Sequence, residues 1–155
     1  MQSEDITAAV KIREEFIELV GRISQAEGLP KSAGRMMGLL IFDGGQVSFG
    51  DMAERLHISR GSVSSSSRVL EEFGLIRRTS KPGQRQDYFE LEEDPYLNLL
   101  DRACVRAKKA KDLIEKSASQ LDESPEIKGR VADFADFYRT MEHCISRTRL
   151  EITQT

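Results

Sequence analysis

Apolar residues recur at helical intervals through the first third of the chain, and helix-breaking residues separate the groups. Residues 6–25 repeat apolar positions along one face, which predicts an amphipathic helix that ends at Gly28 and Pro30. Ser32 is the expected N-cap of a second helix, in which the run 36–42 is so apolar that most of it must be buried. A pair of glycines then ends this helix.

The middle of the chain predicts two short helices joined by a tight turn. A short extended piece leads to Ser48 or Gly50, which opens a helix over 51–56. After the turn, Ser59 is the expected N-cap of a helix that runs to about Phe73, and a glycine follows as its C-cap.

Two strands follow the second of these helices. Residues 75–79 and 86–91 have strand character, and the Lys-Pro-Gly-Gln sequence at 81–84 predicts the turn between them. The order helix, helix, turn, helix, strand, turn, strand is the outline of a winged helix-turn-helix. We therefore expect a mainly α fold with a small β-wing over 79–88, to which N- and C-terminal helices are added.

The C-terminal part predicts two long helices. Asp94-Pro95 begins a helix that runs to about Leu121, and Ser124-Pro125 begins the last one. Apolar residues of the last helix follow a spacing of four and three, which is typical of a helix that packs along another helix. The residues expected to form this contact in a homodimer are Ile127, Val131, Phe134, Tyr138, Met141 and Ile145. The alternative is that helices of the same chain bury this stripe.

These elements divide the chain into three regions. We expect residues 1–30 to form an N-terminal helix that contributes to dimerisation. Residues 31–93 are the predicted winged helix-turn-helix, and residues 94–155 the predicted two-helix dimerisation region.

Positive charge gathers in the middle of the chain, although the whole chain has a net charge of −3. Residues 52–88 hold seven basic and four acidic residues, whereas residues 1–30 hold three basic and six acidic ones. A local excess of Lys and Arg is what binding to a phosphate backbone requires. The segregation therefore favours a nucleic-acid-binding module in the middle region.

The predicted helix 59–73 has two chemically different faces. Val63, Leu70 and Phe73 lie at packing intervals and are expected in the core, with Ser67 between them where a larger residue is usual. Small hydroxyl residues on the other face let a helix backbone approach the major groove, and an arginine can donate two hydrogen bonds to guanine. The DNA-facing residues expected here are Ser59, Arg60, Ser62, Ser64, Ser65 and Arg68. The alternative is an exposed surface helix, although consecutive serines form helices poorly.

The turn of the predicted hairpin is basic. Lys81 and Arg85 flank its tip and are expected to contact phosphate or to enter the minor groove. The alternative is a solvated hairpin tip that binds nothing.

Several stretches of the chain resemble the GbsR-like branch of the MarR superfamily. They are residues 28–30, 34–40, 59–64, 70–78 and 82–85, within a resemblance that extends over about 10–150. It implies a dimeric transcriptional regulator, usually a repressor, with an effector pocket between the DNA-binding lobe and the dimer helices. By matching positions it implies DNA contacts at Arg60, Ser62, Ser64, Ser65, Arg68 and Arg85. Ser67 departs from the apolar residue common at its position, which predicts looser or different packing of the helix.

A small-molecule effector is therefore expected, and its identity stays open. Members of the branch include choline-sensing regulators, and binding of a quaternary ammonium ion requires several aromatic faces. Aromatic residues at helical spacing are more often core residues, so the chain's ten Phe and Tyr residues do not by themselves indicate such a site.

Catalysis and a metal cofactor are not expected. The sequence has no Gly-rich phosphate loop, no nucleophile elbow, and no cluster of carboxylates or histidines at useful spacing. Its two histidines and two cysteines fall short of any metal-ligand spacing. Cys104 and Cys144 are expected to be buried packing residues, and a redox switch is the alternative.

The sequence also predicts the compartment. It has no apolar run long enough to span a membrane, and the acidic residues near its start exclude a secretory leader. Two cysteines are too few for a disulfide framework. We therefore expect a cytoplasmic protein.

The predicted function is that of a sequence-specific regulator of transcription that binds double-stranded DNA. It would read the major groove with helix 59–73 and the backbone or minor groove with wing 79–88, as a homodimer on an inverted repeat. A ligand-responsive repressor is the expected form. The alternative is a winged-helix scaffold that binds proteins and has little specific affinity for DNA.

Overall fold

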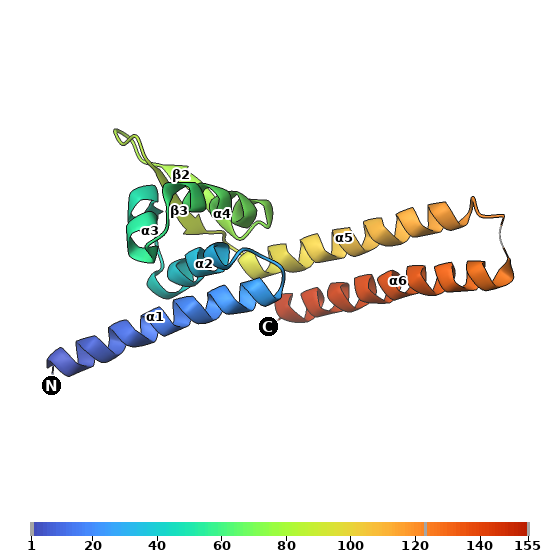
Figure 1. Cartoon of the computed structure of the whole chain (residues 1–155), viewed down its shortest axis with the longest axis horizontal. Helices are drawn as coiled ribbons and strands as arrows, with labels where there is room; N and C mark the ends of the chain where they lie inside the picture. Colours follow the sequence, from blue (N-terminus) through green and yellow to red (C-terminus); the bar gives the residue numbers. More distant parts are fainter. Residues whose placement is uncertain (1, 123, 155) are drawn as a thin grey trace. The chain divides into compact units, whose positions relative to one another are not determined.

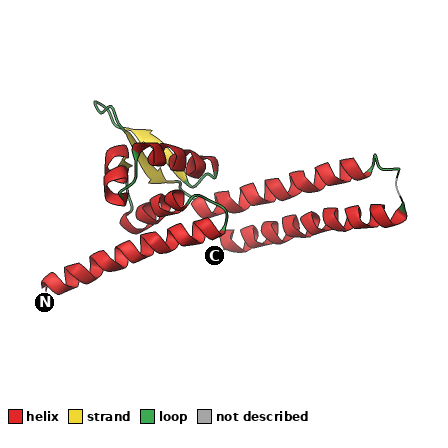
Figure 2. Ribbon diagram, viewed as in Figure 1, coloured by secondary structure: helices red, strands yellow, loops and turns green. Residues whose placement is uncertain are grey.

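The structure, a computed structural model, describes residues 2–122 and 124–154. Met1, Glu123 and Thr155 lie outside the described residues, although the predicted regions 1–30 and 94–155 include them. The described chain is mainly helical and contains one small antiparallel sheet (Figures 1 and 2). The expected fold class, mainly α with a β-wing, is confirmed. None of the described helices is both long and apolar enough to cross a membrane.

The chain divides into two compact units, residues 1–95 and residues 96–155. The elements of the first unit are α1 (Gln2–Ala26), α2 (Lys31–Asp43), β1 (Val47–Ser48), α3 (Phe49–Leu56), α4 (Arg60–Glu72), β2 (Ile76–Ser80) and β3 (Asp87–Leu91). The second unit consists of α5 (Pro95–Ala118), whose first residue closes the first unit, and α6 (Pro125–Thr153).

The core of the first unit is built around α2. Its residues Met36, Leu39 and Leu40 are buried, as the apolar run predicts, and α2 packs against both α1 and α4. At Gly34 a Cβ would lie 2.6 Å from the Ser24 Cβ of α1, so only glycine lets the two helices approach this closely.

The expectation that Ser32 caps α2 is wrong. The helix begins at Lys31 directly after Pro30, whose ring supplies no side-chain acceptor, and no side-chain cap is present. Ser32 instead lies inside the helix, where its Oγ is 2.7 Å from the Oγ of Ser66 in α4.

The helix-turn-helix has well-defined boundaries. Of the two residues proposed to open α3, Ser48 is the N-cap, because its Oγ accepts a hydrogen bond of 3.1 Å from the Asp51 backbone N–H. Gly74 follows α4 with φ 66°, the left-handed conformation typical of a glycine beyond a helix end.

The sheet has the strand order β1-β3-β2 and is antiparallel throughout. Arg78 of β2 pairs with Phe89 of β3, and Ser80 pairs with Asp87 at the end of the ladder nearest the turn. Since side chains alternate between faces, Arg78 and Phe89 share one face, and Arg77 lies on the other with its partner Glu90.

The second unit is a pair of helices joined by polar side-chain contacts. α5 ends at Ala118, three residues before the predicted end, and Ser124 caps α6 by accepting from the Ile127 backbone N–H. Ion pairs join the two helices, namely Asp101–Arg149, Lys111–Glu142 and Glu115–Arg139.

Candidate nucleic-acid interface

The turn before α4 fixes where this helix begins. His57, the C-cap of α3, adopts φ 52° and closes the turn in a left-handed conformation. Ser59 then caps α4, since its Oγ accepts a hydrogen bond of 3.0 Å from the Ser62 backbone N–H. The register of α4, and with it the choice of outward-facing residues, follows from this cap.

The serines of α4 do not all face outwards. Ser66 and Ser67 are buried beside Val63 and Leu70, whereas Ser65 is exposed and Ser64 half-buried. Small side chains at the two buried positions let α4 lie close to α2. The Ser66 hydroxyl is hydrogen-bonded to Ser32 of α2, and the Ser67 hydroxyl donates to a backbone oxygen within α4. Sequence reasoning missed Ser66, although an advance of 100° per residue already places it on the Val63 side.

Ser67 does not loosen the packing of α4. Its side chain is fully buried, and its Oγ donates a hydrogen bond of 3.0 Å to the Ser64 backbone oxygen. The same Oγ accepts from Arg78 at 3.1 Å, so the residue that departs from the family pattern is a polar link to the sheet. Phe73, expected in the core, is half-buried at the C-cap.

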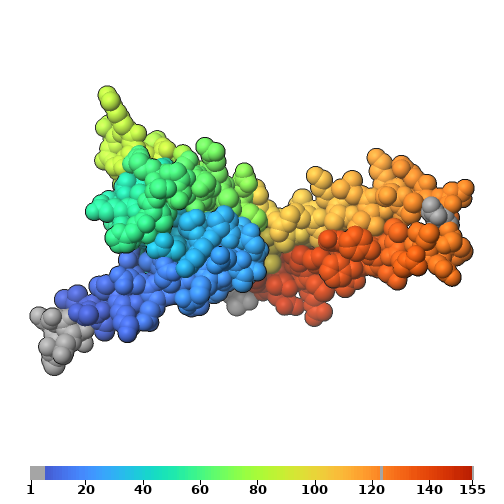
Figure 3. Space-filling model, in the orientation of Figure 1, coloured from blue at the N-terminus to red at the C-terminus, as the bar shows by residue number. Residues whose placement is uncertain are grey.

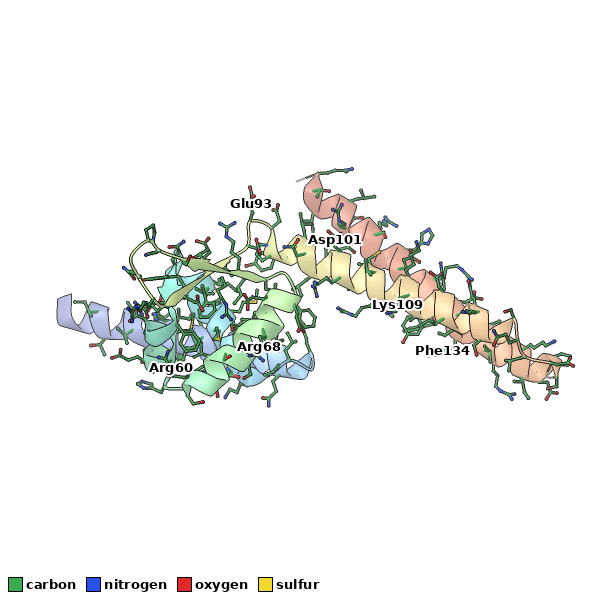
Figure 4. All side chains as sticks on the ribbon, turned by 90° about the horizontal axis from the view of Figure 1, so that it is seen from above. Arg60, Arg68, Glu93, Asp101, Lys109 and Phe134 are labelled. Atoms are coloured by element: carbon green, nitrogen blue, oxygen red, sulfur yellow. The ribbon has the colours of Figure 1, made fainter. Side chains whose placement is uncertain are left out.

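The outward side of α4 carries two arginines without carboxylate partners among the described residues. Figure 4 shows Arg60 and Arg68 along this helix, and both are exposed. The Arg60 guanidinium lies 4.6 Å from the ring centre of Phe49, a cation–π contact that holds it at the start of the helix. Arg68 has no hydrogen bond or ion pair with the described residues.

The β2–β3 hairpin carries the other two predicted cations. Its tip stands out from the rest of the first unit (Figure 3), and Gly83 turns it with φ 77°. Lys81 and Arg85 are both exposed, and the Lys81 amine lies 4.2 Å from the ring centre of Tyr88. Arg85, like Arg68, has no partner within the described part of the chain.

The remaining arginines of the basic segment are bound to carboxylates. Arg55 pairs with Asp43, and Arg77 Nε lies 2.6 Å from Glu90 Oε1. Arg78 pairs with both Glu71 and Asp87. The positive charge counted in the sequence is therefore not all available to a ligand, and the available part is carried by α4 and the hairpin tip.

The electrostatics of these pairs agree with their geometry. The hydrogen bond from Arg77 lowers the pKa of Glu90, and the same bond raises the pKa of Arg77. Desolvation lowers the pKa of Arg78, but hydrogen bonds and charges from Glu71 and Asp87 outweigh it, so the net shift is upward. The two arginines and Glu90 are thus held in their charged forms.

The predicted dimerisation stripe lies on α6, partly against α5. Five of its residues are half-buried, and Phe134 is 53% exposed (labelled in Figure 4). Tyr138, Met141 and Ile145 line a pocket of about 330 Å³ together with small residues of α5. Their role in a dimer stays a prediction.

Other apolar residues of the second unit are exposed, and sequence reasoning did not single them out. They are Tyr96, Val105, Leu113, Phe137 and Leu150. Their positions away from the heptad spacing explain why the pattern did not reveal them.

The cysteines have different environments. Cys104 is half-buried, with its Sγ 3.2 Å from Ser146 Oγ, which fits a packing role. Cys144 is exposed, so the expectation of burial is wrong for this residue, which lies outside the heptad stripe. Among the described residues no group of His, Cys, Asp or Glu is arranged to hold a metal ion.

Two pockets are candidates for an effector site. One of about 300 Å³ in the first unit is lined by three arginines, two glutamates, His57 and two apolar residues. The other is the α5–α6 pocket, where Tyr138 is the one aromatic residue in the lining. Neither lining presents the several aromatic faces that a quaternary ammonium ion requires.

Comparison with known proteins identifies related sequences. Residues 27–87 match the model of the MarR family. Over 135 residues the chain is 31% identical to the HTH-type transcriptional regulator MmpR5 of Mycobacterium tuberculosis, in an alignment that covers 85% of this chain and 81% of that protein.

A solved structure supports the same relationship. The crystal structure of a transcriptional regulator superposes with a TM-score of 0.81 at 27% sequence identity, covering 92% of this chain and 99% of the other. These relatives are regulators and not enzymes, which agrees with the expected absence of catalysis. They also support a DNA-binding regulator and not the alternative of a protein-binding scaffold.

Proposed function

Because the chain belongs to the MarR family of transcriptional regulators, we propose that it binds a specific double-stranded DNA site with α4 in the major groove and the hairpin on the backbone or in the minor groove. The observation that carries this proposal is the position of the unpaired cations. Arg60, Arg68, Lys81 and Arg85 lie on α4 and the hairpin tip, and none of them has a carboxylate partner among the described residues.

The spacing on α4 favours base reading by its two arginines. Arg60 and Arg68 are eight residues apart, which at 1.5 Å per residue separates them by about 12 Å along the helix. Exposed Gly61 and Ser65 lie between them and allow the backbone to approach the groove. We propose that Arg68 donates to a guanine edge and that the stacked Arg60 binds a base or phosphate near the helix start.

We propose that two copies of the chain bind an inverted repeat. The second unit supports this, because few of its residues are buried and many of its large apolar side chains are exposed. A two-fold dimer would place two α4 helices on successive major grooves of the operator.

The finer assignments are also proposals. Repression under the control of a small-molecule effector, and membership of the GbsR-like branch, rest on the sequence motifs of residues 28–90. A calorimetric titration with choline and betaine tests the ligand class. If neither compound produces heat, the effector is not a quaternary ammonium compound of this kind. The linings of the two pockets already favour a different ligand.

The test of the proposed function is selection of bound duplexes from a randomised DNA pool, followed by affinity measurements on the selected duplex at increasing salt concentration. We expect an enriched inverted repeat and a steep loss of affinity with salt. Binding without any enriched motif would contradict sequence-specific regulation. Reporter transcription from a promoter that contains the selected site, with and without the chain, then distinguishes repression from activation.

A further inference from the structure

Arg78 joins the hairpin to α4 and, unlike the cations proposed to bind DNA, it is paired with carboxylates. It lies in the middle of β2, on the face that it shares with Phe89, and its guanidinium is 5.4 Å from the centre of that ring. The neighbouring Arg77 extends from the opposite face. Of the two neighbouring arginines, therefore, Arg78 is the one that reaches α4.

The guanidinium of Arg78 uses all three of its nitrogens. Nε and Nη2 donate to the Glu71 carboxylate at 3.3 and 3.2 Å, and Nη2 also donates to Ser67 Oγ at 3.1 Å. Nη1 donates to Asp87 Oδ2 at 3.0 Å. One side chain thus binds two residues of α4 and the first residue of β3.

The acceptors on α4 are themselves fixed. Ser67 is fully buried, and its own proton is donated to the Ser64 backbone oxygen. A hydroxyl held in this way presents its lone pairs to Arg78, which a larger apolar residue at position 67 could not do. The buried serine of α4 and the arginine of the strand thus depend on each other for this contact.

The contact between Ser67 and Arg78 lies where it can determine the direction of the hairpin tip. Asp87 pairs with Ser80 at the last step of the ladder, and both Lys81 and Arg85 lie beyond that step. The tip itself is exposed and has no apolar core of its own. Fixing Asp87 and β2 to α4 therefore fixes the direction in which the two tip cations extend.

We propose that Arg78 is a positioning residue that orients the wing relative to the recognition helix, so that the tip cations and Arg68 can bind one duplex together. This inference rests on the proposed function. In this proposal Arg78 acts through the wing and not as a DNA contact, because four of its five N–H donors already bind Glu71, Asp87 and Ser67.

The test compares Arg78→Gln in two backgrounds, the natural chain and a wing-neutral chain with Lys81→Gln and Arg85→Gln. The affinity of each protein for the selected operator is measured over a range of salt concentrations. Arg77→Gln is the matched control, since it removes the same charge from the same strand on the opposite face.

In the natural background, Arg78→Gln should weaken operator binding about tenfold and reduce the salt slope by about 0.9 for each phosphate that the tip no longer neutralises. In the wing-neutral background it should change neither quantity by more than about twofold, because the interactions that it positions are already absent. Arg77→Gln should leave both quantities near those of the natural chain. Equal losses of affinity in both backgrounds, or an unchanged salt slope, would overturn the proposal.

A second measurement needs no DNA. Hydrogen exchange of the amides in 79–88 should be faster in Arg78→Gln than in Arg77→Gln, with exchange in α2 unchanged in both. Equal wing exchange in the two variants would also overturn the proposal. If Arg78→Gln does not fold, Ser67→Ala removes the hydrogen bond from Arg78, together with the one to the Ser64 backbone oxygen, and should show the same dependence on the wing background to a smaller degree. A natural chain that selects no DNA sequence would contradict the proposed function, while the exchange result would still decide the role of Arg78.

Discussion

The two units of the chain differ in how much apolar surface they bury. Among the residues whose burial the structure describes, fifteen hydrophobic residues are buried in the first unit, in α1 to α4, the sheet and the adjoining turn, whereas Ala107 and Ala135 are the only ones buried in the second. The α5–α6 pair instead relies on ion pairs at its surface and exposes large apolar side chains such as Phe134 and Phe137. The first unit therefore has an apolar core of its own. Surface ion pairs stabilise little, so the second unit should gain most of its stability when another apolar surface covers it.

The largest effect should follow from opening the core of the first unit. Phe89 is fully buried, and Phe89→Ala should lower the free energy of unfolding by about 3–5 kcal/mol, because apolar burial is removed and a cavity remains. Urea denaturation followed by circular dichroism measures this change. Phe134 of the second unit is exposed, so Phe134→Ala should destabilise the monomeric chain much less. An equal loss of stability would contradict the difference between the two units.

The next effect concerns association. Phe137 is 58% exposed, so Phe137→Asp should leave the helices of one chain intact but weaken dimerisation by about 2 kcal/mol or more, because a charge would enter an apolar interface. Sedimentation velocity at several concentrations detects the shift. Thr140→Asp, which adds the same charge at an exposed polar position of α6, should leave the association constant unchanged. A dimer that persists in Phe137→Asp would place the interface elsewhere.

A smaller effect should separate the DNA-binding surface from the rest. If Arg68 reads a base as proposed, Arg68→Ala should cost about 1–3 kcal/mol at the selected operator and much less on random DNA. Lys109→Ala, an exposed cation of the second unit (Figure 4), should leave both affinities nearly unchanged. Fluorescence anisotropy on the two duplexes measures this difference, and equal losses on both from Arg68→Ala would make it a phosphate contact.

The smallest effect is a dependence on pH. The hydrogen bonds from Arg13, at 2.5 and 2.6 Å, lower the pKa of Asp43 below its ordinary 3.8. A lowered folded-state pKa stabilises the chain above the ordinary value, and this stabilisation is lost as the pH falls through the folded-state pKa. Asp43→Asn should cost about 1 kcal/mol at neutral pH and flatten the loss of stability below about pH 4.

The matched change for this last comparison is in the second unit. Arg147→Gln breaks an ion pair with Glu151 in which both side chains are largely exposed, and its effect should stay within a few tenths of a kcal/mol. Thermal unfolding between pH 3 and pH 7 measures both variants. If stability still falls steeply at low pH in Asp43→Asn, other carboxylates cause the loss.

The sequence predicts the order of the elements well, because short-range signals encode it. Ser59 caps α4, Gly74 follows its end, and Pro125 begins α6, and each of these residues acts within one helical turn. The outward positions of Arg60 and Arg68 follow from the same register. Ser32 misled the prediction because a serine inside the first turn resembles a cap when the helix actually begins after a proline.

The pairing of charges could not be predicted in the same way. Arg77 and Arg78 are neighbours in the sequence, yet strand alternation and the hairpin register give them different partners on opposite faces. Likewise, the heptad stripe of α6 predicts packing against a helix without specifying which one. Tyr138, Met141 and Ile145 face a pocket shared with α5, and the pattern alone does not distinguish this from a contact between chains.

Because some serines of α4 are buried and others exposed, only part of this helix can be changed to alter which operator it recognises. Ser66 and Ser67 are fully buried where α4 meets α2 and the sheet, so a library that placed larger residues there would mostly yield misfolded proteins. Exposed Gly61, Ser65 and Arg68 can be randomised without altering the core. New DNA specificities should therefore be reachable through one side of a single helix, by selection and over short mutational paths, while the scaffold stays as it is.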